Sequence, residues 1–292
     1  MKILAAVDGS ETAFNALRSA CILADKLSAS VMAFYVNKAE EYTPDETGSL
    51  SLKERIAEEL EAGGQNVIRE SLAVGRSFAI GVEGVMAYGI PADEILNFTE
   101  AHGIIKLIAM SHSSKGRGTQ EFVESAARAV VTRSKVPVFV TSSAVDIKRV
   151  LIAVDNSEAT KQVALFGGRL ARSLGAELGI IAFVPDADAL IDEYRLIADV
   201  PNIDRHIEAS EKGLRKILDQ AIAKAREVLD PLAVDVSMVL KKGHAGELIS
   251  EVGPRDALVI GLKRNSREAP ASLSPTADKL LSSHSINVFF VQ

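Results

Sequence analysis

The stretch ILAAVDGSE at residues 3–11 decides the fold, because it returns later in the chain as LIAVDNSE at residues 151–158. Each copy is a short apolar run that ends at an aspartate, and a helical pattern follows it and ends near Leu27 or Leu174. A repeat of this kind fixes the architecture more firmly than local propensity does. The 292-residue sequence therefore predicts two copies of one domain, over residues 1–143 and 148–292.

The segments that follow keep the same order in both halves. The predicted second to fifth strands are residues 30–36, 80–88, 104–110 and 136–141, and then residues 177–184, 234–240, 257–260 and 286–291. Helical patterns at residues 52–71 and 203–229 precede the third strands, and we expect Gly63–Gly64 to interrupt the first of them. Turns at residues 89–95 and 243–249 open further helices. Apolar strands separated by helices predict an α/β fold of two doubly wound, five-stranded parallel-sheet domains in tandem.

The composition excludes several classes of protein. Hydrophobic residues make up 47% and charged residues 25% of the chain, as in a globular protein. A net charge of -6 gives nucleic acid no electrostatic attraction. The apolar stretches are strand-length, far short of the about 20 residues that span a bilayer, and the run at residues 1–8 is too short for a signal peptide. We expect a cytoplasmic protein with no membrane span.

Cysteine and histidine offer little chemistry. Cys21 is the only cysteine and lies in a helical pattern, so we expect a buried, inert thiol and no disulfide. The histidines show no ligand spacing, and no nucleophile or orienting acid is paired with them; they are His102, His112, His206, His244 and His284. Two of them, His112 and His244, fall on loops at the predicted ligand edge. The sequence predicts no metal site and no catalytic residues.

Three short motifs carry a resemblance. The chain resembles the universal stress protein family in VDGSE at residues 7–11, in the turn Gly89-Ile90-Pro91, and in LIAM at residues 107–110, while VDNSE at residues 154–158 repeats the first motif. The resemblance covers nearly the whole chain and implies a Rossmann-like fold of the adenine-nucleotide alpha-hydrolase type. By position it implies that adenine and ribose are held by Asp8 with Val36, and by Asp155 with Val184. We add Gly89, Met110 and Gly243 to these nucleotide-binding candidates.

The family's phosphate loop is Gly, two residues, Gly, nine residues, Gly, then Ser or Thr, after the fourth strand. The first half has Ser111, Ser114, Glu124 and Ser125 at these positions, and the Glu124 carboxylate would repel phosphate. The second half has Gly261, Arg264, Ser274 and Pro275, and Arg264 can fork onto a phosphate. We therefore expect weak or no ATP binding in the first half, and any anionic nucleotide in the second.

Two readings of the first-strand aspartates stay open. Asp8 and Asp155 can bind a ligand, or they can cap the helix that follows, as Ser10 and Ser157 also can. Lys115 and Arg117 form either an alternative anion site or part of a solvated loop.

Two functions compete. The first is a non-enzymatic regulatory module of stress response that needs no cofactor but binds ATP, another adenine nucleotide or another small molecule. The alternative is a dimerising scaffold or carrier of an apolar ligand. An enzyme of the wider superfamily needs a Gly/Ser-rich loop after the first strand, which Asp8-Gly9-Ser10-Glu11 does not supply. The resemblance also implies an intramolecular pseudo-dimer in which the fifth strands pair antiparallel beyond Pro137, and a homodimer of the whole chain is a further expectation.

Overall fold

The structure is a computed structural model that describes residues 1–37, 50–112, 126–183, 203–242, 248–263, 271–283 and 285–292. These residues form two compact units. The first contains Met1–Asp146 with residues 264–272 and 281–290, and the second contains Ile147–Lys263 with residues 273–280 and 291–292. Most of the strand that ends the second repeat therefore belongs to the first unit.

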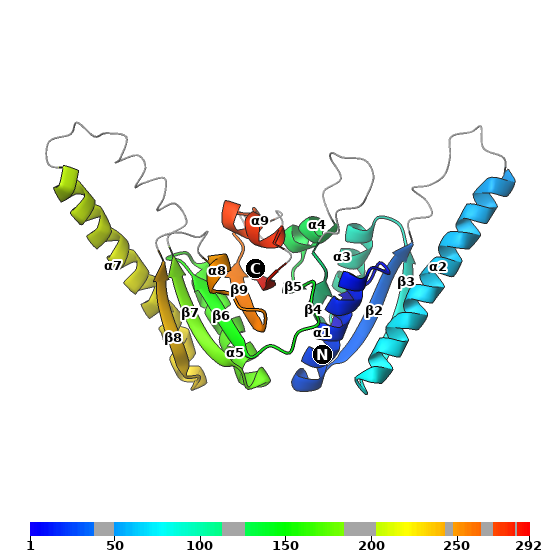
Figure 1. The fold of residues 1–292 in the computed structure, drawn as a ribbon, viewed down its shortest axis with the longest axis horizontal. Helices are drawn as coiled ribbons and strands as arrows, with labels where there is room; N and C mark the ends of the chain where they lie inside the picture. Colours follow the sequence, from blue (N-terminus) through cyan, green and yellow to red (C-terminus); the bar gives the residue numbers. More distant parts are fainter. Residues whose placement is uncertain (38–49, 113–125, 184–202, 243–247, 264–270, 284) are drawn as a thin grey trace. The chain divides into compact units, whose positions relative to one another are not determined.

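The first unit has a sheet in the order β3-β2-β1-β4-β5-β10. Its strands β1 to β5 are parallel, and β10 is antiparallel to β5. Its elements are β1 (Lys2–Ala6), α1 (Glu11–Leu27), β2 (Ser30–Asn37), α2 (Leu50–Ser77), β3 (Val82–Tyr88), α3 (Pro91–Ala101), β4 (Ile105–Met110), α4 (Ala126–Arg133), β5 (Val138–Val140) and β10 (Asn287–Val291). Figure 1 shows α2 running alongside β2 and β3.

Helices cover both faces of this sheet. The Phe34 ring of β2 lies against Phe98 of α3, with ring centroids 4.8 Å apart. The next residue, Tyr35, lies against Gly64 of α2. Successive side chains of a strand point to opposite faces, so α2 and α3 pack on opposite sides. The predicted doubly wound α/β fold is confirmed.

The predicted interruption at Gly63–Gly64 is wrong, because α2 continues through both glycines to Ser77. A Cβ on Gly64 would lie 2.6 Å from the Tyr35 ring and 2.8 Å from the sulfur of Met86. The glycine therefore lets the helix approach the sheet closely, and packing against the sheet outweighs the weak helix propensity of glycine.

The second unit repeats the arrangement with the parallel strand order β9-β6-β7-β8. Its elements are β6 (Arg149–Val154), α5 (Ala159–Leu174), β7 (Glu177–Phe183), α7 (Ile203–Leu229), the 3-10 turn η2 (Asp230–Leu232), β8 (Val236–Lys242), α8 (Leu248–Glu251), β9 (Asp256–Gly261) and α9 (Pro275–Leu281). In Figure 1, α7 lies along β7 and β8 as α2 does along β2 and β3.

The edge of β5 is covered by β10. Phe139 pairs with Phe289 across these strands, and their rings stack with centroids 4.2 Å apart. At the end of β5, Thr141 Oγ1 donates a hydrogen bond of 2.7 Å to Asn287 Oδ1. All five residues of β10 are buried, so the edge is closed by an apolar strand. The arrangement of the two repeats as a pseudo-dimer stays a prediction.

Candidate functional site

The candidate residues of the first repeat lie where its parallel strands end. Asp8 follows β1, Val36 is near the end of β2, Gly89 follows β3, and Met110 with Ser111 ends β4. The chain reverses its direction of travel across the sheet between β1 and β4, and ligands of such sheets bind beyond the strand ends at this point. Ser114, Glu124, Ser125 and the loop with Lys115 and Arg117 lie outside the described residues.

Asp8 holds the turn that begins α1. Its Oδ1 accepts hydrogen bonds from the backbone N–H of Ser10 at 2.9 Å and from the Ser10 hydroxyl at 2.6 Å. The Ser10 Oγ in turn accepts from the N–H of Ala13 at 3.2 Å, so Ser10 is the N-cap of α1. Asp8 thus supports the helix cap, and it is exposed just beyond the end of β1.

Two glycines of this edge have backbone conformations that other residues adopt only with strain. Gly9 has φ +85° and Gly89 has φ +133°. A Cβ on Gly9 would also lie 2.9 Å from Cγ2 of Val67 in α2. The first loop therefore passes directly under α2, and this contact brings α2 to the edge of the candidate site.

His112, which sequence reasoning placed on the ligand edge, follows β4 but is buried, with 1% of its surface exposed. Its Nδ1 is 2.9 Å from the Ser142 hydroxyl. The Ser142 carbonyl accepts a hydrogen bond of 3.1 Å from Nδ2 of Asn15 in α1. His112 therefore joins β4 to the segment after β5, a structural role. His244 lies outside the described residues.

Sequence reasoning missed a tyrosine–carboxylate cluster near Asp8. The Tyr88 hydroxyl donates a hydrogen bond of 2.7 Å to Oε2 of Glu61 in α2, and this bond is the main reason that the pKa of Tyr88 is raised. Burial raises the pKa of Tyr35, and the charges of Asp8 and Glu61 raise it further. The strand pattern places Tyr35 and Tyr88 on a face of the sheet. Only the packing of α2 on that sheet reveals that Glu61 reaches Tyr88.

Asp155 has the same local role in the second repeat. Its Oδ1 accepts a hydrogen bond of 2.9 Å from the N–H of Ser157, and Thr160 Oγ1 donates to its backbone carbonyl. Ser157 does not cap α5, since Glu158 is at the N-cap position and makes no capping bond with its side chain. Val184, Gly243 and Arg264 lie outside the described residues.

Gly261 and Ser274 each have a structural role in the second unit. A Cβ on Gly261 would lie 2.8 Å from Cβ of Ala159 and 3.0 Å from Cγ2 of Val163, so the glycine makes room for α5. Ser274 Oγ accepts a hydrogen bond of 3.2 Å from the N–H of Ala277 and so caps α9. Pro275 begins this helix, at a position where a missing N–H removes no helical hydrogen bond.

The family model of the universal stress protein family matches the chain twice, over residues 1–142 and 146–292. The chain belongs to the universal stress protein family. Universal stress protein MJ0531 of Methanocaldococcus jannaschii is 29% identical over 141 residues, which are 48% of this chain and 80% of that protein.

Solved structures match this chain over both repeats or over one of them. The structure of a universal stress protein from Archaeoglobus fulgidus matches 100% of this chain and 98% of its own, with 17% identity and a TM-score of 0.66. A universal stress protein in complex with cAMP matches 49% of this chain and 98% of its own, with 16% identity and a TM-score of 0.38.

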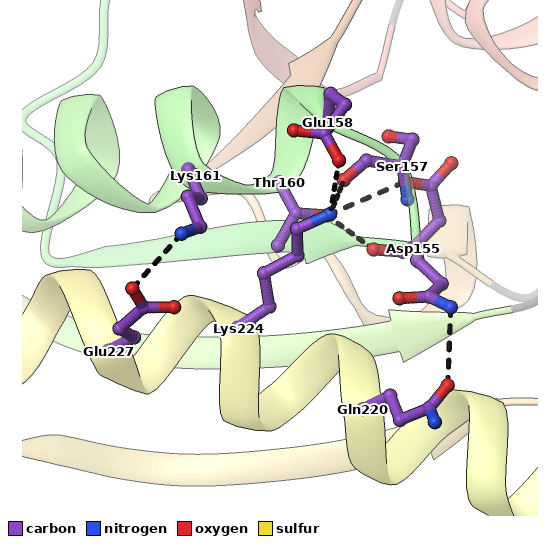
Figure 2. Close-up of polar contacts among 9 residues, drawn as sticks. Asp155, Ser157, Glu158, Thr160, Lys161, Gln220, Lys224 and Glu227 are labelled. Carbon is purple, nitrogen blue, oxygen red and sulfur yellow. Dashed lines mark hydrogen bonds and ion pairs between the residues drawn. The ribbon is translucent and has the colours of Figure 1, made fainter.

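A polar cluster joins α7 to the first loop of the second stress-protein repeat (Figure 2). Lys224 Nζ donates to the Ser157 carbonyl at 2.9 Å and to Oε1 of Glu158 at 3.0 Å. The Lys224 side chain is 18% exposed, whereas Glu158 is 95% exposed. The hydrogen bond and the charge of Lys224 lower the pKa of Glu158.

Two further contacts extend this cluster along α7. Lys161 Nζ lies 3.0 Å from Oε1 of Glu227, and Asn156 Nδ2 donates a hydrogen bond of 3.3 Å to Oε1 of Gln220. Among the described residues, these four polar contacts bridge α7 to the start of α5 and the loop before it.

The first repeat has an open groove between α1 and α2, with a volume of about 560 Å³. Its walls combine charged and apolar side chains: Gly9, Glu11, Phe14, Arg18, Glu70, Ala73, Val74 and Ser77. Arg18 Nη1 is 2.7 Å from Oε1 of Glu11 and 2.7 Å from Oδ1 of Asn15, both on its own helix. The groove therefore lies beside the first loop. Arg18 forms these contacts within α1 and does not bridge to α2.

The remaining expectations concern thiol, metal and membrane chemistry. Cys21 is fully buried, and burial raises the pKa of its thiol to about 11, so the thiolate is scarce at neutral pH. Within the described ranges, no three metal-ligating side chains come together. No helix in those ranges is both long enough and apolar enough to cross a bilayer.

Proposed function

We propose that this universal stress protein is a non-enzymatic regulatory module that binds an adenine nucleotide through its second repeat. The observation that carries this proposal is a reversal of charge on the helix beside the first loop. β3 begins at Val82 and β8 at Val236. When the two repeats are aligned at these residues, Arg215 and Lys224 of α7 occupy the positions of Glu61 and Glu70 in α2.

The buried faces of the two helices support this alignment. Gly64, Ser71 and Gly75 are buried in α2, and Leu218, Ala225 and Leu229 are buried at the corresponding places of α7. Lys224 is paired with Glu158, but with Arg215 it makes this flank less negative than the flank of the first repeat, where two carboxylates repel phosphate. The charge of the second repeat therefore favours an anionic ligand.

Calorimetric titration of the full chain with ATP tests the proposal. Arg264→Ala should weaken binding about 5- to 150-fold, the equivalent of about 1–3 kcal/mol for a lost charge-assisted hydrogen bond. Lys115→Ala, in the matching loop of the first repeat, is the control and should leave binding unchanged. Loss of binding in Lys115→Ala alone would move the site to the first repeat, and an absence of binding by the parent chain would overturn the proposal.

The pairing of β5 with β10 supports a second proposal, that the repeats associate as a pseudo-dimer through their fifth strands. Replacing Phe139 and Phe289 with Asp removes the ring stack and places two carboxylates in the buried ladder. We expect a larger radius in solution scattering, with the helical content retained by circular dichroism. A double variant as compact as the parent would contradict this association.

A further inference from the structure

The residues that line the groove between α1 and α2 of the first repeat have counterparts on α5 and α7 of the second. Because α1 ends at Leu27 and α5 at Leu174, Glu11 corresponds to Glu158 and Phe14 to Lys161. By the alignment of α2 with α7, Glu70 corresponds to Lys224 and Ala73 to Glu227. The groove of the first repeat and the surface between α5 and α7 are thus equivalent places in the fold that carry different side chains.

In the second repeat, a lysine ammonium bridges this surface. Lys224 Nζ binds the Glu158 carboxylate and the Ser157 carbonyl. The pair of Lys161 and Glu227 lies beside it on the same two helices. Figure 2 shows the Lys224 bridge running from α7 to the loop before α5, and the Lys161–Glu227 pair joining α5 to α7. In the second repeat, the carboxylate at the start of the first helix therefore binds an ammonium group, whereas Glu11 in the first repeat is paired with Arg18 of its own helix.

In the first repeat, both bridges are absent and the carboxylate stays. Glu70 replaces the lysine and makes no ion pair within the part of the chain that the structure describes. Phe14 and Ala73 replace the second pair, so an apolar surface lines the groove beside the two carboxylates. The charged residues that line the groove are two glutamates, Glu11 and Glu70, and one arginine, Arg18, so its net charge is negative.

We propose that this groove binds the ammonium group of an amphipathic primary amine, which takes the place that the Lys224 side chain occupies in the second repeat. The ammonium has three N–H donors, and the carboxylates of Glu11 and Glu70, which line the groove, are acceptors of the kind that Glu158 offers to Lys224. Phe14, Ala73 and Val74 contact the apolar part of the ligand. A free metal ion fits less well, because it gains nothing from this apolar wall.

The first experiment compares 2-phenylethylamine with 2-phenylethanol, its neutral analogue, by NMR titration of the full chain. The amine should shift the amide signals of Gly9, Glu11 and Glu70, and the alcohol should not. Raising the ionic strength should weaken binding, since the groove is open to solvent. Equal shifts from the amine and the alcohol would overturn the proposal.

Two variants separate charge recognition from unspecific contact. Glu70→Gln should weaken amine binding about two- to fivefold, which is the range for an exposed ion pair. Glu58→Gln is the matched control, because Glu58 is an exposed residue of the same helix that does not line the groove. Equal affinities of Glu70→Gln and the parent chain would place the amine elsewhere.

Glu70→Lys tests the substitution that the second repeat suggests. The introduced side chain should reach Glu11 as Lys224 reaches Glu158, so amine binding should be lost while the circular dichroism spectrum stays that of the parent. Undiminished amine binding by this variant would show that the ammonium does not occupy the place of Lys224.

Discussion

The two repeats share a fold but differ in the surface between their first two helices. In the first repeat, α1 and α2 enclose an open groove of about 560 Å³, whereas Lys224 and Lys161 bridge the corresponding helices of the second. The strands below show the same register in both repeats near their starts. The difference teaches that the sheet limits which residues can change in the interior, while the helix surfaces are free to exchange one charge for another.

The interior shows how such limits act. Gly167 of α5 lies over Ile152 of β6, and a Cβ on this glycine would be 2.1 Å from the Ile152 Cγ2. The first repeat has Ala20 and Ala5 at the corresponding positions, and both are fully buried. A large residue in one strand is thus matched by a smaller residue in the helix that covers it.

The largest expected effects come from exchanging this pair. Gly167→Ala should destabilise the second repeat by up to about 2 kcal/mol, because an overpacking cost of up to about 3 kcal/mol outweighs a gain of about 1 kcal/mol in helix propensity. Ile152→Ala should cost about 2–5 kcal/mol, since it leaves a cavity. Urea unfolding followed by circular dichroism measures both.

The double variant of Ile152→Ala and Gly167→Ala tests whether the effect of Gly167→Ala on stability changes sign. With Ile152→Ala already present, Gly167→Ala should stabilise the chain by up to about 1 kcal/mol, because the clash is gone and the helix propensity remains. If the second substitution destabilises both backgrounds equally, Gly167 is needed for something other than Ile152.

Breaking the bridge between Lys224 and Glu158 should have a smaller effect on the free energy of unfolding. Lys224→Met keeps the aliphatic stem and removes the ammonium, and we expect only a small loss of stability, because Glu158 is 95% exposed and solvent screens the pair. Glu70→Met at the matching position of the first repeat should cost nothing measurable in urea unfolding. Lys216→Met, an exposed lysine of α7 with no ion pair to the described residues, is the control. Equal losses at Lys224 and Lys216 would contradict a bridge.

The alternation of apolar strands and helices was enough to predict this fold. The recurrence of residues 3–11 at 151–158 fixed the number of repeats, and apolar runs found each described strand within about two residues, the usual uncertainty of element ends. The break at Gly63–Gly64 was predicted wrongly because helix propensity ignores Tyr35, which is distant in sequence and adjacent in space. Packing of this kind cannot be read from a local pattern.

The candidate site was predictable only in part. Strand ends placed Asp8, Gly89 and Ser111 at one edge, because parallel strands finish at the same side of a sheet. The sequence does not reveal that Asp8 supports the Ser10 cap, or that Glu61 reaches Tyr88 from a helix. These contacts depend on side-chain direction and on the position of α2 over the sheet.

The tyrosine cluster allows a spectroscopic comparison of the repeats. Glu61→Gln should lower the pKa of Tyr88, because the variant loses a carboxylate that accepts the phenol hydrogen bond and repels the phenolate. The second repeat has Arg215 and Ala182 at the places of Glu61 and Tyr35, so the effect belongs to the first repeat alone. NMR titration of the tyrosine rings measures it, with Glu58→Gln as the control. An unchanged pKa of Tyr88 would mean that the Tyr88 hydroxyl does not donate a hydrogen bond to Glu61.

The smallest effect concerns the pH dependence of Glu158. Lys224 donates a hydrogen bond to this carboxylate and its charge acts in the same direction, so the pKa of Glu158 lies below its usual value. A carboxyl group whose pKa is lower in the folded chain stabilises the fold above its unfolded pKa, about 4.3 for Glu. This stabilisation is lost as the pH falls through the lower, folded pKa.

Lys224→Met should therefore raise the pKa of Glu158 and remove its share of the acid sensitivity. We expect only a slight change in stability, because solvent screens a carboxylate as exposed as Glu158. NMR titration of the side-chain carboxyl carbons resolves the pKa itself, with the parent chain and Lys216→Met titrated alongside. The pKa should be lowest in the parent chain and in Lys216→Met, and higher in Lys224→Met. If all three chains titrate together, the Glu158 carboxylate does not bind Lys224 in solution, and the two repeats do not differ in this bridge.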